Sequence, residues 1–563
     1  MQAFDPAFKG DFIRLGEIDL GDGVVLDRNV MVEMRDGVRL ACDVYRPAAE
    51  GKHPVLFATS RYMKDTVYLE TLPSRRWRET GDIAGWVRRG FVYILGDTRG
   101  SGQSEGQYGF FDATEQTDLY DMIEWAGVQP WSNGRVGMIG ESYFAMVQWA
   151  AALQNPPHLK CIAPYDGCTD LYRDLVYKGG IHYNTFSDFW YNDTRGRHFL
   201  HYPARGGRDD YFQMDVPRIQ FLHPWFDDFW KVRQFDTSKI TIPVFSIGNW
   251  IGLNAHLRSN LMAFEKLRGP KKLMVNSQPA QDIFHTPLVE EPLARWYDYW
   301  LKGIDNGVMD EPPVRIAVRN GKGYRDEREW PLARATTRKL YLAPGPSGAV
   351  ESLNDGSLSW SEPAKDVAPT AYTYPDPEWS YPSLGAGMVR GRSGLPHNTR
   401  KILTFTSPPL EEDVEVTGPI AMTLFAASSE PDTQFIVQIM DQPPLTDDMA
   451  KAIRVMDVAP PAQRVTMGWL KASHRELDSQ LSTELRPWHT HSNPQPLEPN
   501  HIYEYKIEIW PTSWVFKAGH RVRVDITATD GLHFLGHMQS TDTLYHDAAH
   551  PSHLLLPVVP KAG

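Results

Sequence analysis

Short apolar runs alternate with helical patterns over the first 280 residues. HPVLFATS (53–60) and FVYILGDTRG (91–100) are bounded by polar residues and glycine, as is typical of strands buried on both faces of a parallel sheet. Between residues 113 and 129, apolar side chains recur at spacings of three and four, which predicts a helix. Three later runs have the same strand pattern: LKCIAPYDG (159–167), ITIPVFSIGNW (240–250) and KKLMVNS (271–277). The alternation predicts a mostly parallel sheet with helices on both faces.

Two further patterns divide the chain. Ahead of the parallel run, residues 24–34 and 38–47 are rich in β-branched side chains and flank Asp36-Gly37, which predicts an antiparallel hairpin. Beyond about residue 335, short alternating stretches such as IAMTLFAAS and RVRVDITAT are separated by Pro, Gly and Asp, a pattern typical of a β-sandwich or jelly roll. Residues 171–238 interrupt the α/β pattern with an aromatic density above the 12% average of the chain. We therefore predict an α/β core (1–170 and 239–335), a helical cap (171–238) and a jelly-roll domain (336–563).

The candidate nucleophile lies at one strand-to-helix junction. The strand predicted at 135–139 runs through Gly140-Glu141-Ser142-Tyr143 into an alanine-rich helical stretch. A serine on such a turn is a nucleophile elbow, and it needs small neighbours, here Gly140 and Ala145, because backbone and helix approach closely. The helix N-terminus favours the anion that forms when a serine oxygen attacks a carbonyl carbon. The pattern predicts an α/β-hydrolase core with Ser142 as nucleophile, against the alternative of a turn that merely contains serine.

The string G-E-S-Y-F-A resembles the G-x-S-Y-x-G/A elbow of the cocaine esterase and Xaa-Pro dipeptidyl-peptidase family (CocE/NonD hydrolases), although Phe144 occupies the second glycine position of the general G-x-S-x-G motif. MRDGVRLACDVYRP, GDTRGSGQSEG and RWYDYWLKG also resemble segments of that family. EVTGPIAMTLFAAS and WPTSWVFKAGHRVRVDI resemble its jelly-roll domain. The resemblance covers nearly the whole chain.

The resemblance implies acyl transfer in two steps, with a histidine and an acid as base. It assigns the oxyanion hole to the Tyr62 hydroxyl and the Tyr143 N–H. The family's acid lies in a G-W-Y-D-G-like string, but the matching stretch, residues 248–252, reads G-N-W-I-G and places Ile251 at the acid. The family's histidine position is held by Ala280. The usual acid and histidine are therefore both unmatched.

Two explanations compete. In the first, the triad is repaired by His285 as base and Asp166 as acid, with Asp282 as a second candidate acid; the alternative for each is an ordinary loop or hydrogen-bonding role. In the second, the base is lost, and the pocket supports a non-hydrolytic cyclisation, elimination or acyl transfer, or only binds a ligand. Four cap histidines are further candidate bases: His182, His198, His201 and His223. The first explanation predicts a serine hydrolase cleaving a carboxylic ester or amide that carries an apolar or aromatic group.

Composition and charge limit the kinds of binding partner that we expect. The net charge of −12 is spread without long blocks of one sign, which argues against nucleic acid and anionic membranes and leaves a small-molecule substrate. The three cysteines, Cys42, Cys161 and Cys168, have no disulfide or zinc spacing, so we expect buried small side chains. Metal and nucleotide motifs are lacking, so we expect no cofactor. The sequence shows neither a secretion signal nor a membrane span, and we expect a cytoplasmic protein; self-association is left open.

Overall fold

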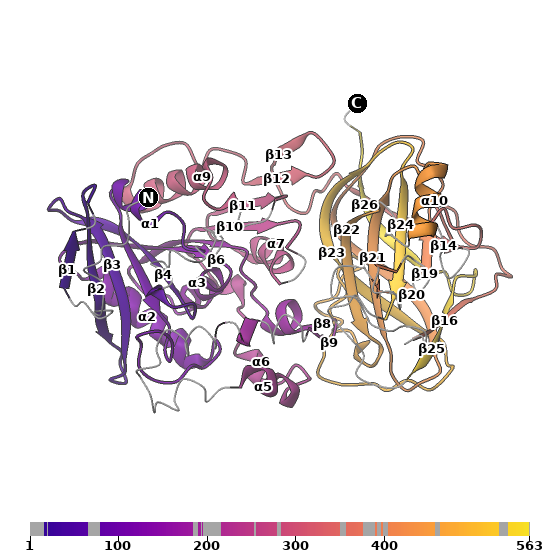
Figure 1. Cartoon of the computed structure of the whole chain (residues 1–563), viewed down its shortest axis with the longest axis horizontal. Helices are drawn as coiled ribbons and strands as arrows, with labels where there is room; N and C mark the ends of the chain where they lie inside the picture. Colours follow the sequence, from indigo (N-terminus) through magenta and orange to yellow (C-terminus); the bar gives the residue numbers. More distant parts are fainter. Residues whose placement is uncertain are drawn as a thin grey trace.

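The computed structural model shows two lobes side by side, an N-terminal α/β lobe and a C-terminal lobe of long strands (Figure 1). It describes most of the chain, namely residues 16–19, 21–65, 79–183, 190–192, 194, 215–252, 255–278, 283–349, 356–374, 389–390, 396–397, 403–456, 462–528 and 539–561. No described helix is long and apolar enough to cross a membrane.

The α/β lobe is organised around a mixed sheet of the order β1-β2-β3-β5-β4-β6-β7-β10-β11-β12-β13. The strands from β5 to β12 in this order are parallel, and antiparallel strands flank them at both ends. Their bounds are β1 Gly16–Asp19, β2 Val24–Glu33, β3 Arg39–Pro47, β4 His53–Ser60, β5 Val92–Asp97, β6 Ser132–Glu141, β7 Leu159–Tyr165, β10 Val244–Asn249, β11 Lys271–Asn276, β12 Val314–Val318 and β13 Gly323–Glu327. This confirms the predicted α/β class and its mostly parallel sheet.

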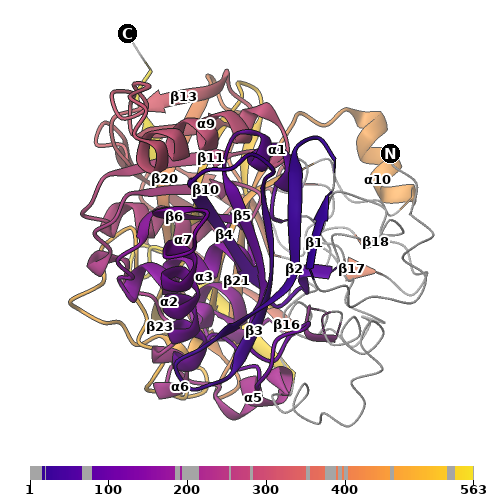
Figure 2. The same cartoon turned by 90° about the vertical axis from the view of Figure 1, so that its left-hand side faces the viewer.

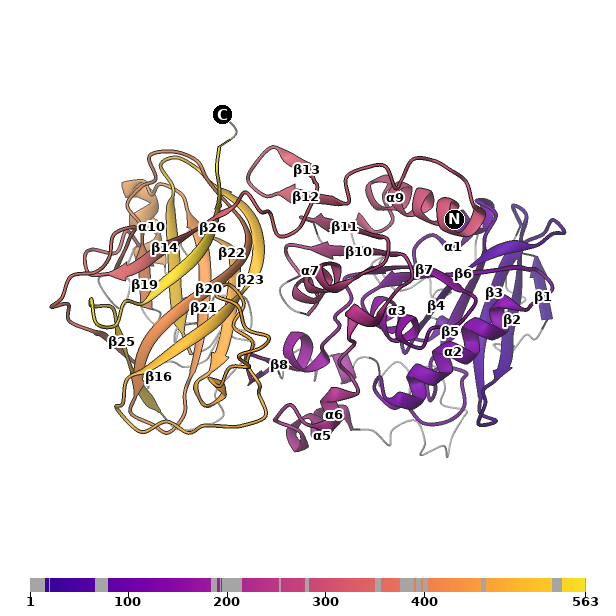
Figure 3. The same cartoon turned by 180° about the vertical axis from the view of Figure 1, so that it is seen from behind.

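Helices cover both faces of this sheet, as Figure 2 and Figure 3 show from two further sides. One face carries α1 (Ile83–Arg88) and α9 (Pro287–Tyr297), and the other carries α2 (Ala113–Gly127), α3 (Tyr143–Leu153) and α7 (Leu257–Lys266). The side chains of α1 and α9 pack in one apolar cluster with the sheet, while those of α2 and α3 pack in a second. Packing of helices on both faces therefore holds in place the edge of the sheet at which β6 meets α3.

Local chemistry explains where these elements begin and end. Gly37 has φ +83° in the turn between β2 and β3, which is the left-handed conformation that the Asp-Gly pair predicts. Asp112 caps α2, because its carboxylate accepts a hydrogen bond from the Glu115 N–H at 2.8 Å. The three cysteines are free and buried, as expected.

The C-terminal lobe is all β in its core. Its strands run in the order β16-β25-β20-β23-β22-β21-β24-β19-β15-β14-β26, and β26 also pairs with β20, so that the sheet folds back around an apolar core. The bounds are β14 Thr336–Ala343, β15 Ser357–Ser359, β16 Thr370–Tyr374, β19 Leu403–Thr406, β20 Val414–Ser428, β21 Gln434–Gln442, β22 Gln463–Lys471, β23 Tyr503–Phe516, β24 Arg521–Thr527, β25 Ser540–Tyr545 and β26 His553–Val559. One helix, α10 (Asp447–Met456), and the short pair β17 (Val389–Arg390) and β18 (Pro396–His397) complete the described elements beyond single 3₁₀ turns.

The segment between β7 and β10 lies beside the C-terminal lobe (Figure 1). Its described elements are the π-helix η4 (Leu171–Val176), β8 (Tyr177–Lys178), β9 (Ile181–His182), α5 (Val216–Leu222), α6 (Asp228–Lys231) and η7 (Thr237–Lys239). Much of the predicted cap, including Phe186, Phe189, Phe199, Tyr211 and Phe212, lies outside the described residues. The predicted domain boundaries stay predictions.

The hairpin of β8 and β9 docks this segment on the C-terminal lobe. The Lys471 N–H, at the end of β22, donates to the Gly179 carbonyl at 2.8 Å. Gly179 has φ +56°, and a Cβ there would lie 1.9 Å from the Trp469 carbonyl oxygen. Only glycine fits this contact without displacing backbone.

We expect Gly179→Ala to lower the free energy of unfolding by more than Gly90→Ala does. Both positions have positive φ, so both substitutions carry a backbone strain of about 1–2 kcal/mol, but a Cβ at Gly90 meets nothing within 4 Å. The difference between the two variants in urea unfolding isolates the clash with Trp469. Equal losses would show that the hairpin shifts freely away from β22.

Candidate active site

Ser142 occupies the sharp turn between β6 and α3, at φ 60° and ψ −116°. This is the strained conformation that lifts a nucleophile above a sheet. Close packing enforces it: a Cβ on Gly140 would lie 2.4 Å from Phe144 Cβ, and one on Gly167 would lie 2.6 Å from Ala145 Cβ. The small residues that the sequence analysis identified around the serine are therefore required by contact.

The histidine at Ser142 is His256, which the sequence analysis missed. Its Nε2 lies 3.4 Å from Ser142 Oγ, and it stands directly before α7. Its signal in the sequence was only positional: it lies in the loop after β10, at the sheet edge where parallel strands of an α/β fold place their functional groups.

The surroundings of His256 keep its ring neutral. Burial, and to a smaller extent the charge of Lys178, lower the pKa of His256 to about 3. A neutral Nε2 can accept the Ser142 proton across the physiological pH range. The Nδ1 atom, which an acid holds in a Ser-His-Asp triad, is buried and finds no hydrogen-bond partner among the described residues.

Tyr62 also reaches the serine, as predicted for an oxyanion residue. Its hydroxyl accepts a hydrogen bond from Trp190 Nε1 at 3.2 Å and also interacts with the Ser142 side chain. Burial and the nearby Glu79 raise the pKa of Tyr62, so the hydroxyl keeps its proton. It is therefore available as a hydrogen-bond donor at neutral pH.

Tyr143 begins α3, so its N–H is one of the first-turn donors that have no acceptor inside the helix. Its side chain is anchored because its hydroxyl is hydrogen-bonded with the Glu115 carboxyl group and with the Tyr108 hydroxyl. Its ring packs edge-on against Tyr62, with centroids 5.9 Å apart. The anchored ring fixes the backbone that carries the N–H.

Among the described residues, the histidine in contact with Ser142 is His256, and the contact seen for His285 is with Phe284. His285 is half-buried just before α9, with its ring 5.6 Å from that of Phe284. Among the cap histidines, His182 contacts the Gln220 side-chain oxygen and His223 contacts Asp227, while His198 and His201 lie outside the described residues. The role predicted for His285 as base stays a prediction, and His256 is the competitor that the geometry supplies.

Asp166 follows β7 directly, in the left-handed conformation with φ 47°. Its Oδ1 is buried without a hydrogen-bond partner among the described residues, and burial raises the pKa of Asp166 to about 8. A carboxyl group in this state is neutral at pH 7 and carries no charge with which to stabilise an imidazolium. The other candidate acid, Asp282, lies outside the described residues.

The turn after β10 has no carboxylate where the family resemblance implies one. Ile251 is 43% exposed, and the turn is held by hydrogen bonds from Asn249 Nδ2 to the Gln278 carbonyl and from Trp250 Nε1 to the Ala317 carbonyl. Gly252 lies between His256 and Asp166: its carbonyl accepts a hydrogen bond from the His256 backbone N–H at 3.4 Å, and a Cβ on it would lie 3.9 Å from Asp166 Oδ1.

Comparison with known proteins agrees with this architecture. The X-Pro dipeptidyl-peptidase (S15 family) profile matches residues 36–279, and the X-Pro dipeptidyl-peptidase C-terminal non-catalytic domain matches residues 306–556. Cocaine esterase of Rhodococcus sp. (strain MB1 Bresler) is 28% identical over 95% of this chain and 98% of its own length. The crystal structure of a CocE/NonD family hydrolase from Staphylococcus aureus superposes with a TM-score of 0.78 at 25% identity, over 95% of this chain and 94% of that chain. The chain belongs to the CocE/NonD hydrolase family.

Other relatives of this CocE/NonD hydrolase are named as dipeptidyl-peptidases. A putative Xaa-Pro dipeptidyl-peptidase of Bacillus cereus is 23% identical over 90% of this chain and 87% of its own length. The relatives are thus named as esterases and as dipeptidyl-peptidases, which supports an ester or amide hydrolase.

The neutral state of Asp166 gives a pH-dependent prediction. A carboxyl whose pKa is raised on folding contributes stability that is present below its unfolded pKa and is lost as the pH rises through the folded value, here from 3.8 to about 8. Relative to wild type, the free energy of unfolding of Asp166→Asn should therefore be about 2.6 kcal/mol more favourable to the folded state at pH 7 than at pH 5.

Urea unfolding at both pH values measures this difference. The exposed Asp228, whose pKa is lowered by Lys231, provides the matched control, because Asp228→Asn should shift stability equally at both pH values. A difference between Asp166→Asn and wild type that does not change with pH would show that Asp166 is ionised in the folded protein.

Proposed function

We propose that the protein hydrolyses a carboxylic ester or amide through an acyl-enzyme on Ser142, with His256 as general base. The observation that carries the proposal is the convergence of His256 Nε2 and the Tyr62 hydroxyl on the Ser142 side chain. The Ser142 to His256 distance of 3.4 Å is long for a hydrogen bond, as is common before substrate binds.

The first half-reaction follows from this geometry. Ser142 Oγ attacks the carbonyl carbon while its proton passes to His256 Nε2, and the carbonyl π electrons move to the oxygen. The Tyr62 O–H and the Tyr143 N–H donate to that oxyanion. When the tetrahedral intermediate collapses, His256 returns the proton to the departing alcohol or amine, and water repeats the sequence to release the acid.

Aromatic rings around the serine suggest the substrate. The Tyr62 ring lies 6.0 Å from that of Phe144, and the Trp190 ring stacks on Tyr143 at 6.4 Å. Such walls favour an apolar or aromatic acyl or alcohol group. Among the relatives' activities we favour ester cleavage, because the sequence offered no fixed acidic anchor for the ammonium of a dipeptide substrate.

A second candidate is a non-hydrolytic acyl transfer, cyclisation or elimination in the same pocket. It is favoured because, within the described part of the chain, His256 Nδ1 has no partner and Asp166 is neutral, so no anionic acid supports the proposed base there. Both acylation and the attack of water on the acyl-enzyme depend on this base. If water is activated slowly, the acyl-enzyme persists, and an acceptor other than water can attack it instead.

Labelling with a fluorophosphonate probe tests the proposed base. Ser142→Ala should abolish labelling, and His256→Ala should slow it by about 10³-fold or more, because the proton of Ser142 then has no acceptor. His285→Ala should label at the rate of wild type. Peptide mapping of the adduct identifies the labelled serine.

The same experiment separates the alternatives. Slow labelling of His285→Ala with normal labelling of His256→Ala would reverse our choice of base in favour of the repaired triad with His285. Absence of labelling in the wild type would indicate a binding protein. Labelling at Ser142 combined with turnover of p-nitrophenyl esters only when an alcohol or amine acceptor is added would identify the non-hydrolytic candidate.

A further inference from the structure

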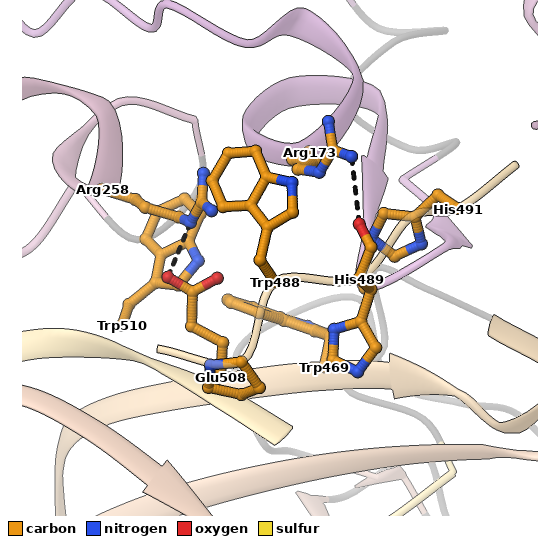
Figure 4. Close-up of a pocket in the computed structure, with 10 residues that line it drawn as sticks. Arg173, Arg258, Trp469, Trp488, His489, His491, Glu508 and Trp510 are labelled. Carbon is orange, nitrogen blue, oxygen red and sulfur yellow. Dashed lines mark hydrogen bonds and ion pairs between the residues drawn. The ribbon is translucent and has the colours of Figure 1, made fainter. Parts of the chain in front are cut away.

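His256 Nδ1 has no hydrogen-bond partner among the residues that the structure describes, which raises the question of what orients the ring, since an acid does this in a triad. We propose that the C-terminal domain does so, through Glu508 of β23 and Arg258 of α7, as positioning residues for His256. This inference rests on the proposed function, in which His256 is the base. Figure 4 shows the contact in a small cavity between the two lobes.

Arg258 binds one carboxylate from each of the two domains. Its Nε donates to Glu508 Oε1 at 2.8 Å, and its Nη1 donates to Asp174 Oδ1, in η4, at 3.0 Å. Arg258 is only 4% exposed and Asp174 is fully buried. A guanidinium presents its donors in a rigid planar fork, so the two carboxylates together fix the position of the α7 first turn.

That turn carries His256, two residues before Arg258. Its own backbone holds it weakly: the His256 N–H to Gly252 carbonyl and Asn260 N–H to His256 carbonyl distances are both 3.4 Å. The side chains after His256 make shorter contacts, since Ser259 Oγ accepts from the Thr169 N–H at 2.8 Å and also bonds Asp174. The anchoring of α7 by side chains therefore sets the position from which His256 reaches Ser142.

The C-terminal domain presents a loop to the same site. Arg486 forms an ion pair with Glu265 of α7, and Arg173 Nη2 donates to the His489 carbonyl at 3.0 Å. In Figure 4 the Trp488 ring lies between Arg173 and Arg258, whose guanidinium carbons are 4.7 and 5.2 Å from its centroid. Glu508 is thus part of a continuous contact that ends at Arg258, two residues from the proposed base.

The test uses full-length protein and the two rate constants of fluorophosphonate labelling. Glu508→Gln should lower the maximal labelling rate by about 10- to 100-fold, with the half-saturating probe concentration unchanged, because the base is displaced while the pocket is intact. Arg258→Lys, whose single ammonium cannot fork to both carboxylates, should have the same effect, and the double variant should be no slower than the slower single one.

Glu504→Gln is the matched control, on the same strand but in an exposed pair with Lys506, and it should label at the wild-type rate. Wild-type rates in Glu508→Gln and Arg258→Lys, or a change confined to half-saturation, would overturn the positioning role. If His256→Ala labels normally, the proposed function fails instead, so the two failures are distinguishable. Thermal unfolding of each variant ensures that labelling is measured on folded protein.

Discussion

The site depends on one contact, between Ser142 Oγ and His256 Nε2. The elbow raises the hydroxyl, and Tyr62 and Tyr143 bring donors to the place where an oxyanion would form, but neither removes the proton from the serine. Burial lowers the pKa of His256 to about 3, so the resting ring is a neutral acceptor at neutral pH. The same burial makes the imidazolium costly, so the position of the ring, rather than its basicity, must supply reactivity.

The fold was predictable from the sequence, and so were some of the residues that lie together around Ser142. The apolar runs and the Asp-Gly turn predict the sheet because strand burial and turn chemistry are local properties, and the Gly140 to Ala145 string predicts the elbow for the same reason. Tyr62 and Tyr143 were predictable only through the family resemblance, and the structure brings both to the serine.

The proposed base, His256, could not be found in this way. His256 is separated from Ser142 by more than one hundred residues and lies in no motif, and its proximity arises from the crossover that places β10 next to β7. The sequence analysis favoured His285 because it is nearest along the chain to the family's histidine position. Spatial order at the edge of a parallel sheet, not distance along the chain, decides which loop reaches the nucleophile.

The two lobes are coupled at this edge. A buried arginine that binds a carboxylate from each lobe is stable only while both partners are in place, because loss of one leaves an incompletely compensated buried charge. The C-terminal domain therefore does more than cover apolar surface in this account: it completes the support of α7. Nothing comparable is needed where an acid holds the histidine ring directly.

The most direct test of the central claim is the rate of fluorophosphonate labelling of Ser142 between pH 4 and pH 8, over the range in which near-UV circular dichroism shows folded protein. Because the pKa of His256 is about 3, the account predicts a rate that is independent of pH down to about pH 4.5. A rate that falls as the pH drops through about 6.5, the ordinary histidine value, would contradict it and would point to a solvated base such as His285.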